Sequence, residues 1–226
     1  MMDNAEILSV IQHSDSFFPT GSVSFSWGAE SLINEHIIDS AEDIEILLVN
    51  QLTQRWQDFD RVVLVHAFNQ TEQISTIEEL DEYVETLILN EEFREGSKRL
   101  GNAMLSTYKS LGNQIASDYL TRVYEQNALG HQLVVQALIW KSIRLSINSI
   151  QFISAYNLCV NILGAGLRLG KIGHIESQAI LSNLHSVILK AISREVPSVD
   201  QIRAYTPCVD IASMRHEISD LRLFIN

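Results

Sequence analysis

The sequence is poor in cysteine, in proline and in long apolar runs, and these shortages exclude several classes of protein. Only Cys159 and Cys208 occur, with no C-x-x-C pair, so neither a disulfide framework nor a cysteine zinc site is expected. No run approaches the ~20 apolar residues of a membrane span, and the N-terminus lacks a signal-peptide pattern. We therefore expect a soluble, cytoplasmic protein.

Positive charge is also scarce. Lys and Arg number 16 against 28 Asp and Glu, and the formal net charge is -12. Such a field repels phosphate backbones and anionic lipid surfaces, so neither a nucleic acid nor a membrane is an expected partner. Hydrophobic residues make up 46% and charged residues 19% of the chain, which favours a folded core over disorder.

Signatures of catalysis and of cofactor binding are missing. The glycine-rich segment 163–173 lacks the G-x-x-x-x-G-K-[ST] spacing and has Ile172 where the Mg²⁺-binding hydroxyl should be, so close helix packing followed by a turn explains its glycines better. His216-Glu217 begins an H-E pair, but Asp220 stands where a zinc helix needs its second histidine. No Gly-x-Ser-x-Gly elbow occurs. We expect no enzyme, no cofactor and no metal site.

Helical periodicity dominates what is present, and the three prolines leave long stretches for helices. Ile180, Leu184, Val187, Ile188 and Ala191 share the spacing of one buried helical face. The pattern predicts a single all-α domain over residues 1–226, a bundle of about ten helices. The expected helices cover residues 4–13, 28–36, 41–68, 77–89, 91–111, 114–127, 131–148, 151–168, 174–194, 198–204 and 210–224.

Local signals refine these boundaries. Capping boxes are predicted where a hydroxyl precedes an acidic or amide residue by three positions. The sequence offers them at Ser40-Asp43, Thr76-Glu79 and Ser198-Gln201. The β-branched run 62–65 is the best strand candidate, although it lies inside a helical window.

The segment 207–226 combines an amphipathic pattern with dense mixed charge. Asp210 is a candidate N-cap, and one stripe collects the apolar residues Ile211, Met214, Ile218, Leu221 and Phe224 or Ile225. A terminal helix with such a stripe either closes the core of its own domain or is lent to a partner. The pattern alone leaves both interpretations open.

Residues 14–30 form the second unusual segment, in which hydroxyls, aromatics and turn formers lie between two helical windows. Pro19 and Gly21 break the helix, and the four aromatic side chains need cover: Phe17, Phe18, Phe25 and Trp27. An ordered loop pinned to the helices and an interaction surface with aromatic anchors both fit this composition.

Both ends together resemble the UreF family of urease accessory proteins. The matching motifs are Ser14-Asp-Ser-Phe-Phe-Pro-Thr-Gly-Ser22, Gly28-Ala-Glu30, Arg94-Glu-Gly-Ser-Lys-Arg-Leu-Gly101, Gly130-His131, Arg168-Leu-Gly-Lys-Ile-Gly173, and Thr206-Pro-Cys-Val-Asp-Ile-Ala-Ser-Met-Arg-His-Glu217 with Arg222-Leu-Phe224. Phe25, Ala29 and His174 depart from the family pattern, so roles of the usual side chains at those positions are not carried over.

This resemblance implies an all-α homodimer that binds the accessory protein UreD (also called UreH) and recruits the GTPase UreG. The assembly would deliver nickel to apo-urease, with this chain as a scaffold and GTPase modulator and with segments 1–30 and 206–226 ordered by partners. The alternatives are a helical metal-dependent hydrolase whose site assembles only in the fold, and an arginine-finger activator using Arg222 or Arg168.

The resemblance also supplies candidate contact residues at both ends. Arg222 is expected to fix the tail, because a guanidinium can bridge carbonyls and a carboxylate at once. The candidate partner-binding residues are Pro19, Thr20, Gly21, Ser26, Gly28 and Glu30 on an N-terminal surface, and Met214, Arg215, His216, Glu217, Arg222 and Phe224 in the tail.

Overall fold

A computed structural model describes residues 3–19 and 25–216, and every regular element within those ranges is helical, as predicted. The α-helices are α1 (Asn4–Ser14), α2 (Ala29–Asn34), α3 (Ala41–Gln51), α4 (Arg61–Asn69), α5 (Ile74–Leu87), α6 (Glu91–Ser110), α7 (Gln114–Tyr124), α8 (Gln132–Ser142), α9 (Ile147–Arg168), α10 (His174–Ile192) and α11 (Pro207–His216). A π-helical segment, η2 (Leu52–Asp60), joins α3 to α4, and a 3-10 turn, η3 (Val199–Gln201), lies between α10 and α11.

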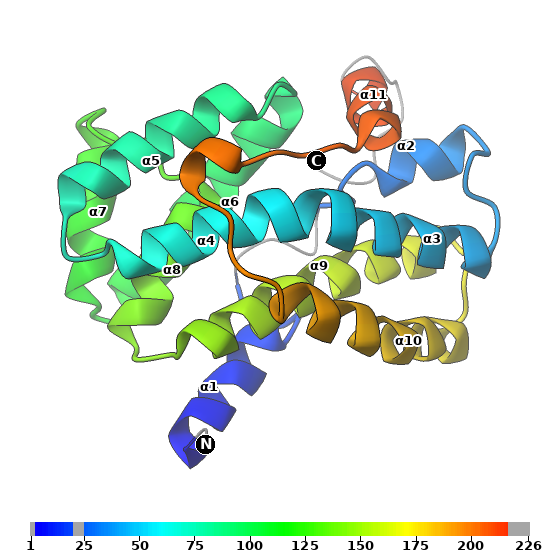
Figure 1. The fold of residues 1–226 in the computed structure, drawn as a ribbon, viewed down its shortest axis with the longest axis horizontal. Helices are drawn as coiled ribbons and strands as arrows, with labels where there is room; N and C mark the ends of the chain where they lie inside the picture. Colours follow the sequence, from blue (N-terminus) through cyan, green and yellow to red (C-terminus); the bar gives the residue numbers. More distant parts are fainter. Residues whose placement is uncertain (1–2, 20–24, 217–226) are drawn as a thin grey trace.

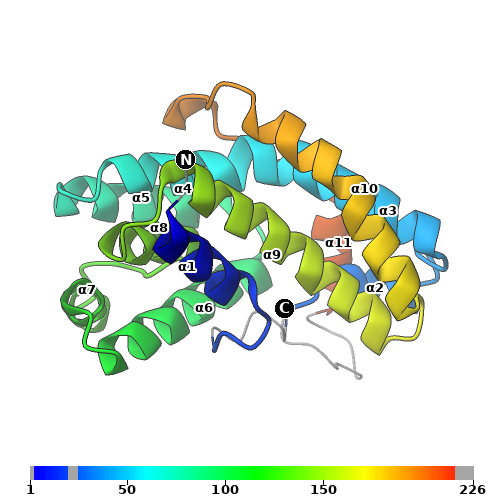
Figure 2. The same ribbon diagram turned by 90° about the horizontal axis from the view of Figure 1, so that it is seen from below.

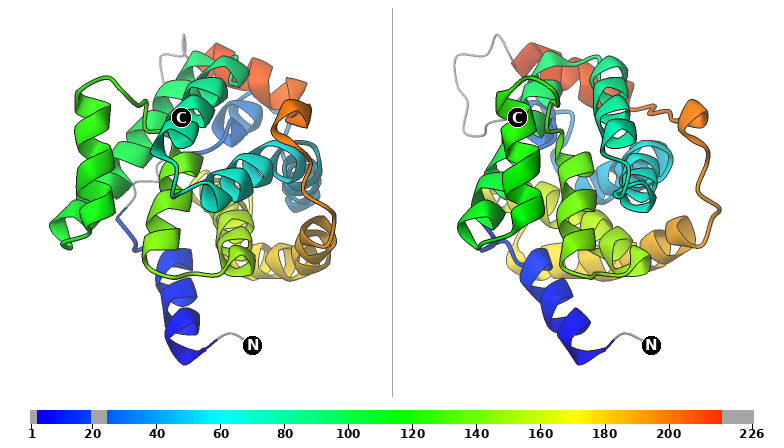
Figure 3. Two further views of the ribbon diagram at one scale, coloured as in Figure 1. Left: turned by 60° about the vertical axis from the view of Figure 1, so that its left-hand side comes forward. Right: turned by 90° about the vertical axis from the view of Figure 1, so that its left-hand side faces the viewer.

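The helices surround one long rod. Figure 1 shows α3, η2 and α4 running across the molecule, with α5, α6, α7 and α8 grouped at the α4 end and α2 and α11 near α3. Seen from below, α9 and α10 lie along the other side of the rod and α1 packs across α9 (Figure 2). Helix α1 projects from the body in the side views (Figure 3). The core lies where α4, α8 and α9 meet.

Burial explains why the strand candidate is helical. Val62, Val63 and Leu64 are fully buried and Val65 nearly so, all within α4. Their β-branched side chains would suit a strand, but a helix that is covered on every side tolerates them because packing outweighs a propensity difference of a few tenths of a kcal/mol. The strand interpretation is therefore wrong.

One of the three predicted capping boxes is present in the structure. The capping box at Ser40 is confirmed, since Ser40 Oγ accepts from Asp43 N at 3.2 Å and Asp43 Oδ2 accepts from Ser40 N at 3.0 Å. The other two predicted boxes are wrong. Helix α5 begins two residues before Thr76, and Ser198 makes no side-chain capping bond to η3. Residues 202–204 are not helical, contrary to the prediction for 198–204.

The chain turns between α8 and α9 earlier than predicted. Periodicity suggested helices over 131–148 and 151–168, but α8 ends at Ser142, and Ser146 Oγ caps α9 by accepting from Ser149 N at 3.2 Å. Arg144 makes the turn with a φ of 64°. The break is hidden in the sequence because apolar residues continue on both sides of it.

The α10 face and the glycine segment behave as the sequence indicates. Ile180, Leu184, Ile188 and Ala191 are buried, whereas Val187 is only partly covered. A Cβ on Gly166 would stand 2.8 Å from Ile44 Cδ1, so α9 and α3 approach too closely for a larger residue. These glycines serve helix packing and a turn.

A buried carboxylate organises the end of the molecule that holds α5 to α8. Asp81 is 0% exposed; its Oδ2 accepts from Leu129 N at 2.9 Å, Gly130 N at 2.6 Å and Tyr119 Oη at 3.0 Å, and its Oδ1 accepts from His131 N at 2.9 Å. Burial, reinforced by this carboxylate, raises the pKa of Tyr119. One side chain thus fixes the loop that starts α8.

Neighbouring polar groups extend this arrangement. His131, also fully buried, bonds Glu85 Oε2 through Nε2 at 2.8 Å and Ser97 Oγ through Nδ1 at 3.1 Å. A Cβ on Gly101 would lie 2.0 Å from the Gly130 carbonyl oxygen, so α6 presses directly on the loop. The motifs around Gly101 and Gly130-His131 therefore describe one packing contact between α6 and the start of α8.

Helix α9 is long and apolar enough to meet the length and composition criteria for a membrane span, with a mean hydropathy of 1.4. In this fold 67% of its most apolar stretch is buried inside the protein. A central core helix has the same composition, and the packing of α9 against α4 and α10 identifies it as one.

Candidate functional site

The position of α11 is set by the extended strap, residues 193–206, that follows α10. Tyr205 N donates to Gln54 O at 2.9 Å, and Arg203 N donates to Asp58 O at 3.1 Å. Both acceptors lie one turn apart in η2, where the sequence predicted an uninterrupted α-helix. The strap is therefore attached to the π-helical segment through its own backbone.

A buried arginine secures the other end of the strap. Arg61 is 2% exposed; its Nη2 donates to Ile192 O at 2.9 Å and Arg194 O at 2.6 Å, and its Nε donates to Gln151 Oε1 at 2.7 Å. The guanidinium thus satisfies carbonyls at the C-terminus of α10, where a cation is also favoured by the helix dipole. Burial lowers the pKa of Arg61. The guanidinium nevertheless keeps its charge, because arginine remains protonated in proteins.

Helix α11 docks through small and polar side chains rather than through the predicted stripe. Val209, Ala212 and Ser213 are buried, whereas Ile211 is 50% and Met214 45% exposed. Of the two interpretations that the pattern left open, closure of the chain's own core does not hold for Ile211 and Met214, whose side chains are exposed. The other members of the stripe, Ile218, Leu221, Phe224 and Ile225, lie outside the described residues. Asp210 is inside α11, not its N-cap.

The closest approach is between α11 and Gly28, the residue before α2. Gly28 has a φ of 79°, and a Cβ there would stand 3.0 Å from Val209 Cγ1 and 3.2 Å from Val209 O. Glycine is required here twice, for the left-handed backbone and for the contact. Gly28, which belongs to one of the motifs shared with the UreF family, is thus the residue against which Val209 of α11 packs.

Polar bonds tie α11 to two neighbouring segments, the start of α6 and the end of α2. Ser213 Oγ donates to Glu92 Oε2 at 3.1 Å, and Asn90 Nδ2 donates to Asp210 O at 3.3 Å. On the outside, Arg215 Nη1 pairs with Glu35 Oε2 at 2.9 Å. An exposed pair of this kind contributes less than about 1 kcal/mol, so the docking of α11 depends mainly on the buried contacts.

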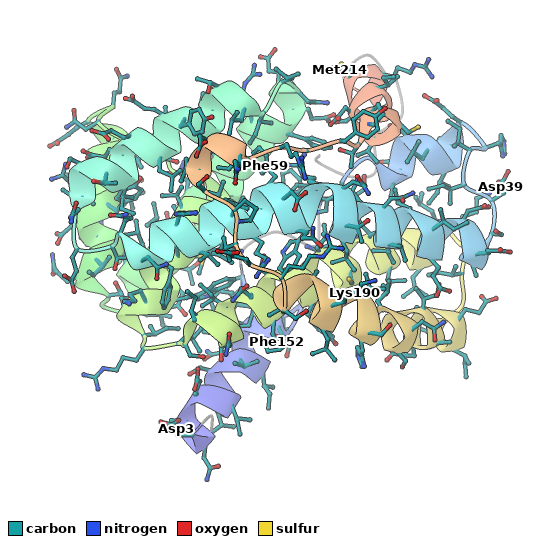
Figure 4. The ribbon with its side chains drawn as sticks, viewed as in Figure 1. Asp3, Asp39, Phe59, Phe152, Lys190 and Met214 are labelled. Atoms are coloured by element: carbon teal, nitrogen blue, oxygen red, sulfur yellow. The ribbon has the colours of Figure 1, made fainter. Side chains whose placement is uncertain are left out.

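The exposed side of α11 continues into an apolar surface. Leu89, 82% exposed, and Met214 line the same small cavity of 130 Å³, and Ile211 lies one turn before Met214. Figure 4 shows Met214 on the outer side of α11. We refer to Leu89, Ile211 and Met214 as the α11 patch. Apolar side chains exposed together at a chain end are typical of an interaction surface.

Beneath this patch, Arg55 of η2 lies among aromatic rings. Its Cζ is 5.3 Å from the Phe59 ring centroid, 5.5 Å from that of Phe93 and 5.7 Å from that of Trp27. Asp60 Oδ1 is 3.5 Å from Arg55 Nε. These contacts give a 6% exposed guanidinium both cation–π and ionic stabilisation.

Two carboxyl groups share the field of Arg55. Burial raises the pKa of Asp60 and also that of Asp210 on α11. Arg55 opposes the rise at both carboxyls, and a hydrogen bond from Thr206 opposes it at Asp210 as well. Arg55 and Asp210 line the 130 Å³ cavity together. The helix and the buried arginine are thus electrostatically linked.

The predicted N-terminal surface is mostly not a surface. Ser26 and Glu30 are at most 1% exposed and Gly28 is buried, so these three residues do not form an open surface, contrary to the prediction; Gly28 lies against Val209 of α11. Pro19 is exposed. Thr20 and Gly21 lie outside the described residues.

The four loop aromatics divide in the same way. Phe25 is buried, and Phe18 and Trp27 are partly covered, whereas Phe17 is 92% exposed, against the expectation that all four need cover. The segment around residues 25–30 is therefore pinned to the helices, and Phe17 stands outside that packing.

The predicted tail residues divide between described and undescribed positions. Met214 and Arg215 are exposed on α11, and His216 is the last residue of that helix. Glu217, Arg222 and Phe224 lie outside the described residues. Arg168, the other nominal arginine finger, ends α9 and its Nε donates to Gly164 O at 3.1 Å.

A second apolar surface lies on the opposite side of the core, between α1, α9 and α10. This groove has a volume of 720 Å³ and is lined mainly by Val10, Ile11, Phe152, Tyr156, Ile188 and Leu189. Ile11 is 60% and Leu189 57% exposed. Figure 4 shows Phe152 where α1 crosses α9.

Sequence reasoning missed several residues of these surfaces. Arg55 and Leu89 carry no local signal, because their neighbours come from distant segments. Asn90 and Glu92 could have been found from the N-cap pattern that starts α6, in which Asn90 Oδ1 accepts from Phe93 N at 3.2 Å. Within residues 3–19 and 25–216, no three His, Cys, Asp or Glu side chains are grouped to hold a metal ion.

The all-α fold agrees with the resemblance of the sequence motifs to the class of urease accessory proteins. The profile of the UreF family matches residues 38–185. Proteins described as urease accessory protein UreF are similar over nearly the whole chain: one from Trichodesmium erythraeum is 31% identical, covering 99% of this chain and 98% of its own length. One from Yersinia enterocolitica is 26% identical over 100% of both chains, and one from Ureaplasma parvum 24% over 99% and 98%. The chain belongs to the UreF family.

Proposed function

We propose that this chain is a non-enzymatic scaffold for urease maturation that binds UreD (UreH), recruits the GTPase UreG and so supports GTP-dependent insertion of nickel into apo-urease. The single observation that carries the proposal is the α11 patch. Helix α11 is held by the buried side chains Val209, Ala212 and Ser213, which leaves the larger apolar side chains Ile211 and Met214 outside.

The neighbouring contacts suit such a role. The strap fixes where α11 begins, and the buried Gly28 lies against Val209 of the helix, so the patch is presented on a defined surface. A preorganised helix face loses less conformational entropy on binding than a loop. We assign UreD to the α11 patch and the exposed segment at Pro19; in this proposal UreG joins only through the complex and brings the nucleotide.

Charging the α11 patch is expected to abolish the complex without unfolding the chain. The double variant Ile211→Glu/Met214→Glu places two carboxylates where apolar burial contributes about 1.5–3 kcal/mol per side chain, so affinity for UreD should fall at least about hundredfold. The measurement is size-exclusion chromatography with light scattering after co-expression with UreD and UreG.

A matched control is Ile46→Glu/Ile175→Glu, which charges two exposed isoleucines on α3 and α10 away from the patch. It should retain the complex. If the patch variant still forms the complex at wild-type stability, or if wild-type protein forms none, the proposed function is wrong.

We also propose that the chain is a homodimer, formed through the groove between α1, α9 and α10. Two copies carrying a net charge of -12 each repel one another, so the interface must be an apolar surface. The groove is concave, and the exposed side chains of Ile11 and Leu189 protrude at it. A two-fold interface needs such self-complementarity, because the same surface of each copy must fit the other.

Leu189→Glu is expected to convert the dimer to a monomer, because it buries a carboxylate in an apolar interface and should raise the dimer dissociation constant at least about hundredfold. Light scattering across a concentration series reports the mass. Ile175→Glu, on the same helix but outside the groove, should stay dimeric. A wild-type chain that remains monomeric at high concentration contradicts the proposal.

A further inference from the structure

A third surface, separate from the α11 patch and the α1/α9/α10 groove, lies where α4, α5 and the η3 turn meet. It is an open groove of 510 Å³, and the residues that matter most in it are His66, Glu79, Leu80, Tyr83, Val199 and Asp200. It shares no lining residue with the cavity under α11. In Figure 1 the η3 turn lies beside α5 at this position.

The walls of this groove are fixed. His66 Nε2 is 2.8 Å from Pro197 O, which holds the strap just before η3. Arg203 N bonds Asp58 O just after it. Because η3 is attached on both sides, the groove is present before any partner arrives.

Its floor and rim differ in character. Glu79 and Tyr83 are four residues apart and Leu80 and Tyr83 three, so all three lie on one side of α5, the side that lines the groove. Leu80 is 7% and Tyr83 36% exposed, and Val199 of η3 faces them across the groove. The floor is thus an apolar slot with one aromatic wall.

The rim carries negative charge from both sides. Glu79 lies on α5 and Asp200 on η3, and neither makes an ion pair within the described part of the chain. Helix α5 contains five acidic residues and neither Lys nor Arg. Among the lining residues only His66 could become cationic, and its Nε2 is already engaged by Pro197 O. Low-dielectric walls focus such a field into the groove.

We propose that this groove binds an extended segment of a partner protein in which an aliphatic side chain is flanked by Lys or Arg. The aliphatic group would fill the slot between Leu80, Tyr83 and Val199, and the cations would pair with Glu79 and Asp200. Opposite charges across such a rim steer the encounter and select the partner. The inference does not depend on UreD or UreG binding elsewhere.

The test uses the full chain, immobilised, to select from a phage-displayed library of random peptides. Selected sequences should be enriched in a basic–aliphatic–basic pattern. The dissociation constant of a selected peptide, measured by fluorescence anisotropy, should rise about tenfold or more in Glu79→Lys/Asp200→Lys. Asp118→Lys/Glu125→Lys, which changes the net charge equally on α7 and at the residue that follows it, should bind within about twofold of wild type.

Two results would overturn the inference. One is a selection without enrichment of basic–aliphatic sequences. The other is binding that the groove reversal and the α7 reversal weaken equally, because the effect would then be general charge attraction and not the groove. Circular dichroism on both variants confirms that each is folded before binding is compared.

Discussion

Replacing Asp81 with Ala is expected to lower the free energy of unfolding by about 3–5 kcal/mol. The substitution leaves three backbone N–H groups, of Leu129, Gly130 and His131, and the Tyr119 hydroxyl without the acceptor that they share. Each buried donor left unpaired costs about 1–3 kcal/mol, and no other acceptor replaces the lost carboxylate at a fully buried site. Urea denaturation followed by circular dichroism measures the difference.

The neighbouring substitution Glu82→Ala is the control, because Glu82 is exposed on the same helix and surface changes usually stay within about 0.5 kcal/mol. A loss of less than about 1 kcal/mol for Asp81→Ala would show that water or a rearranged loop satisfies these donors. The loop before α8 would then not depend on the carboxylate.

Gly28→Val is the second substitution with a large expected effect, and it acts on function through the position of α11. A valine at this position would have to adopt the left-handed backbone conformation, at a cost of roughly 1–2 kcal/mol. Its Cβ would also stand only 3.0 Å from Val209 Cγ1 and 3.2 Å from Val209 O. The chain should keep its helix content but lose the docked α11 and with it the proposed complex with UreD. Limited proteolysis at α11 and light scattering of the co-expressed complex report the two losses.

Gly112→Val separates the backbone cost from the contact. Gly112 has a φ of 81°, close to that of Gly28, but nothing lies within 4 Å of the position of its Cβ. This variant should be destabilised by the same backbone term and still present α11. Equal loss of the complex in both variants would mean that the Gly28–Val209 contact does not hold the helix in place.

Most helices could be predicted from the sequence because their apolar spacing is a local property. The buried face of α10 and the Ser40-Asp43 capping box are confirmed. In each case the residues that make up the signal lie close to one another in the sequence. The predictions went wrong where distant packing decides the structure. The turn at Arg144, for example, interrupts two segments that are both apolar, so the periodicity extended the first helix to residue 148 and began the next only at 151.

The candidate site was predictable in its location but not in its arrangement. Both chain ends were singled out, and residues from both do meet at Gly28 and Val209. Which side of α11 faces inward could not be predicted, because the tight approach to Gly28 favours Ala212 and Ser213 over the larger Ile211 and Met214. The Arg55 site could not be found either, since its rings come from the N-terminal loop, η2 and α6.

The attachment of the strap to η2 constrains the length of the strap more than the residue types in it. The two bonds to Gln54 O and Asp58 O come from the backbone amides of Tyr205 and Arg203, so a side-chain exchange at either position leaves them intact unless the new residue is proline. One inserted or deleted residue after 205 would instead rotate α11 by about 100° and bring a different side of it against α2. Residues 193–206 therefore act as a spacer of fixed length that sets which face of α11 packs against the body and which face stays exposed.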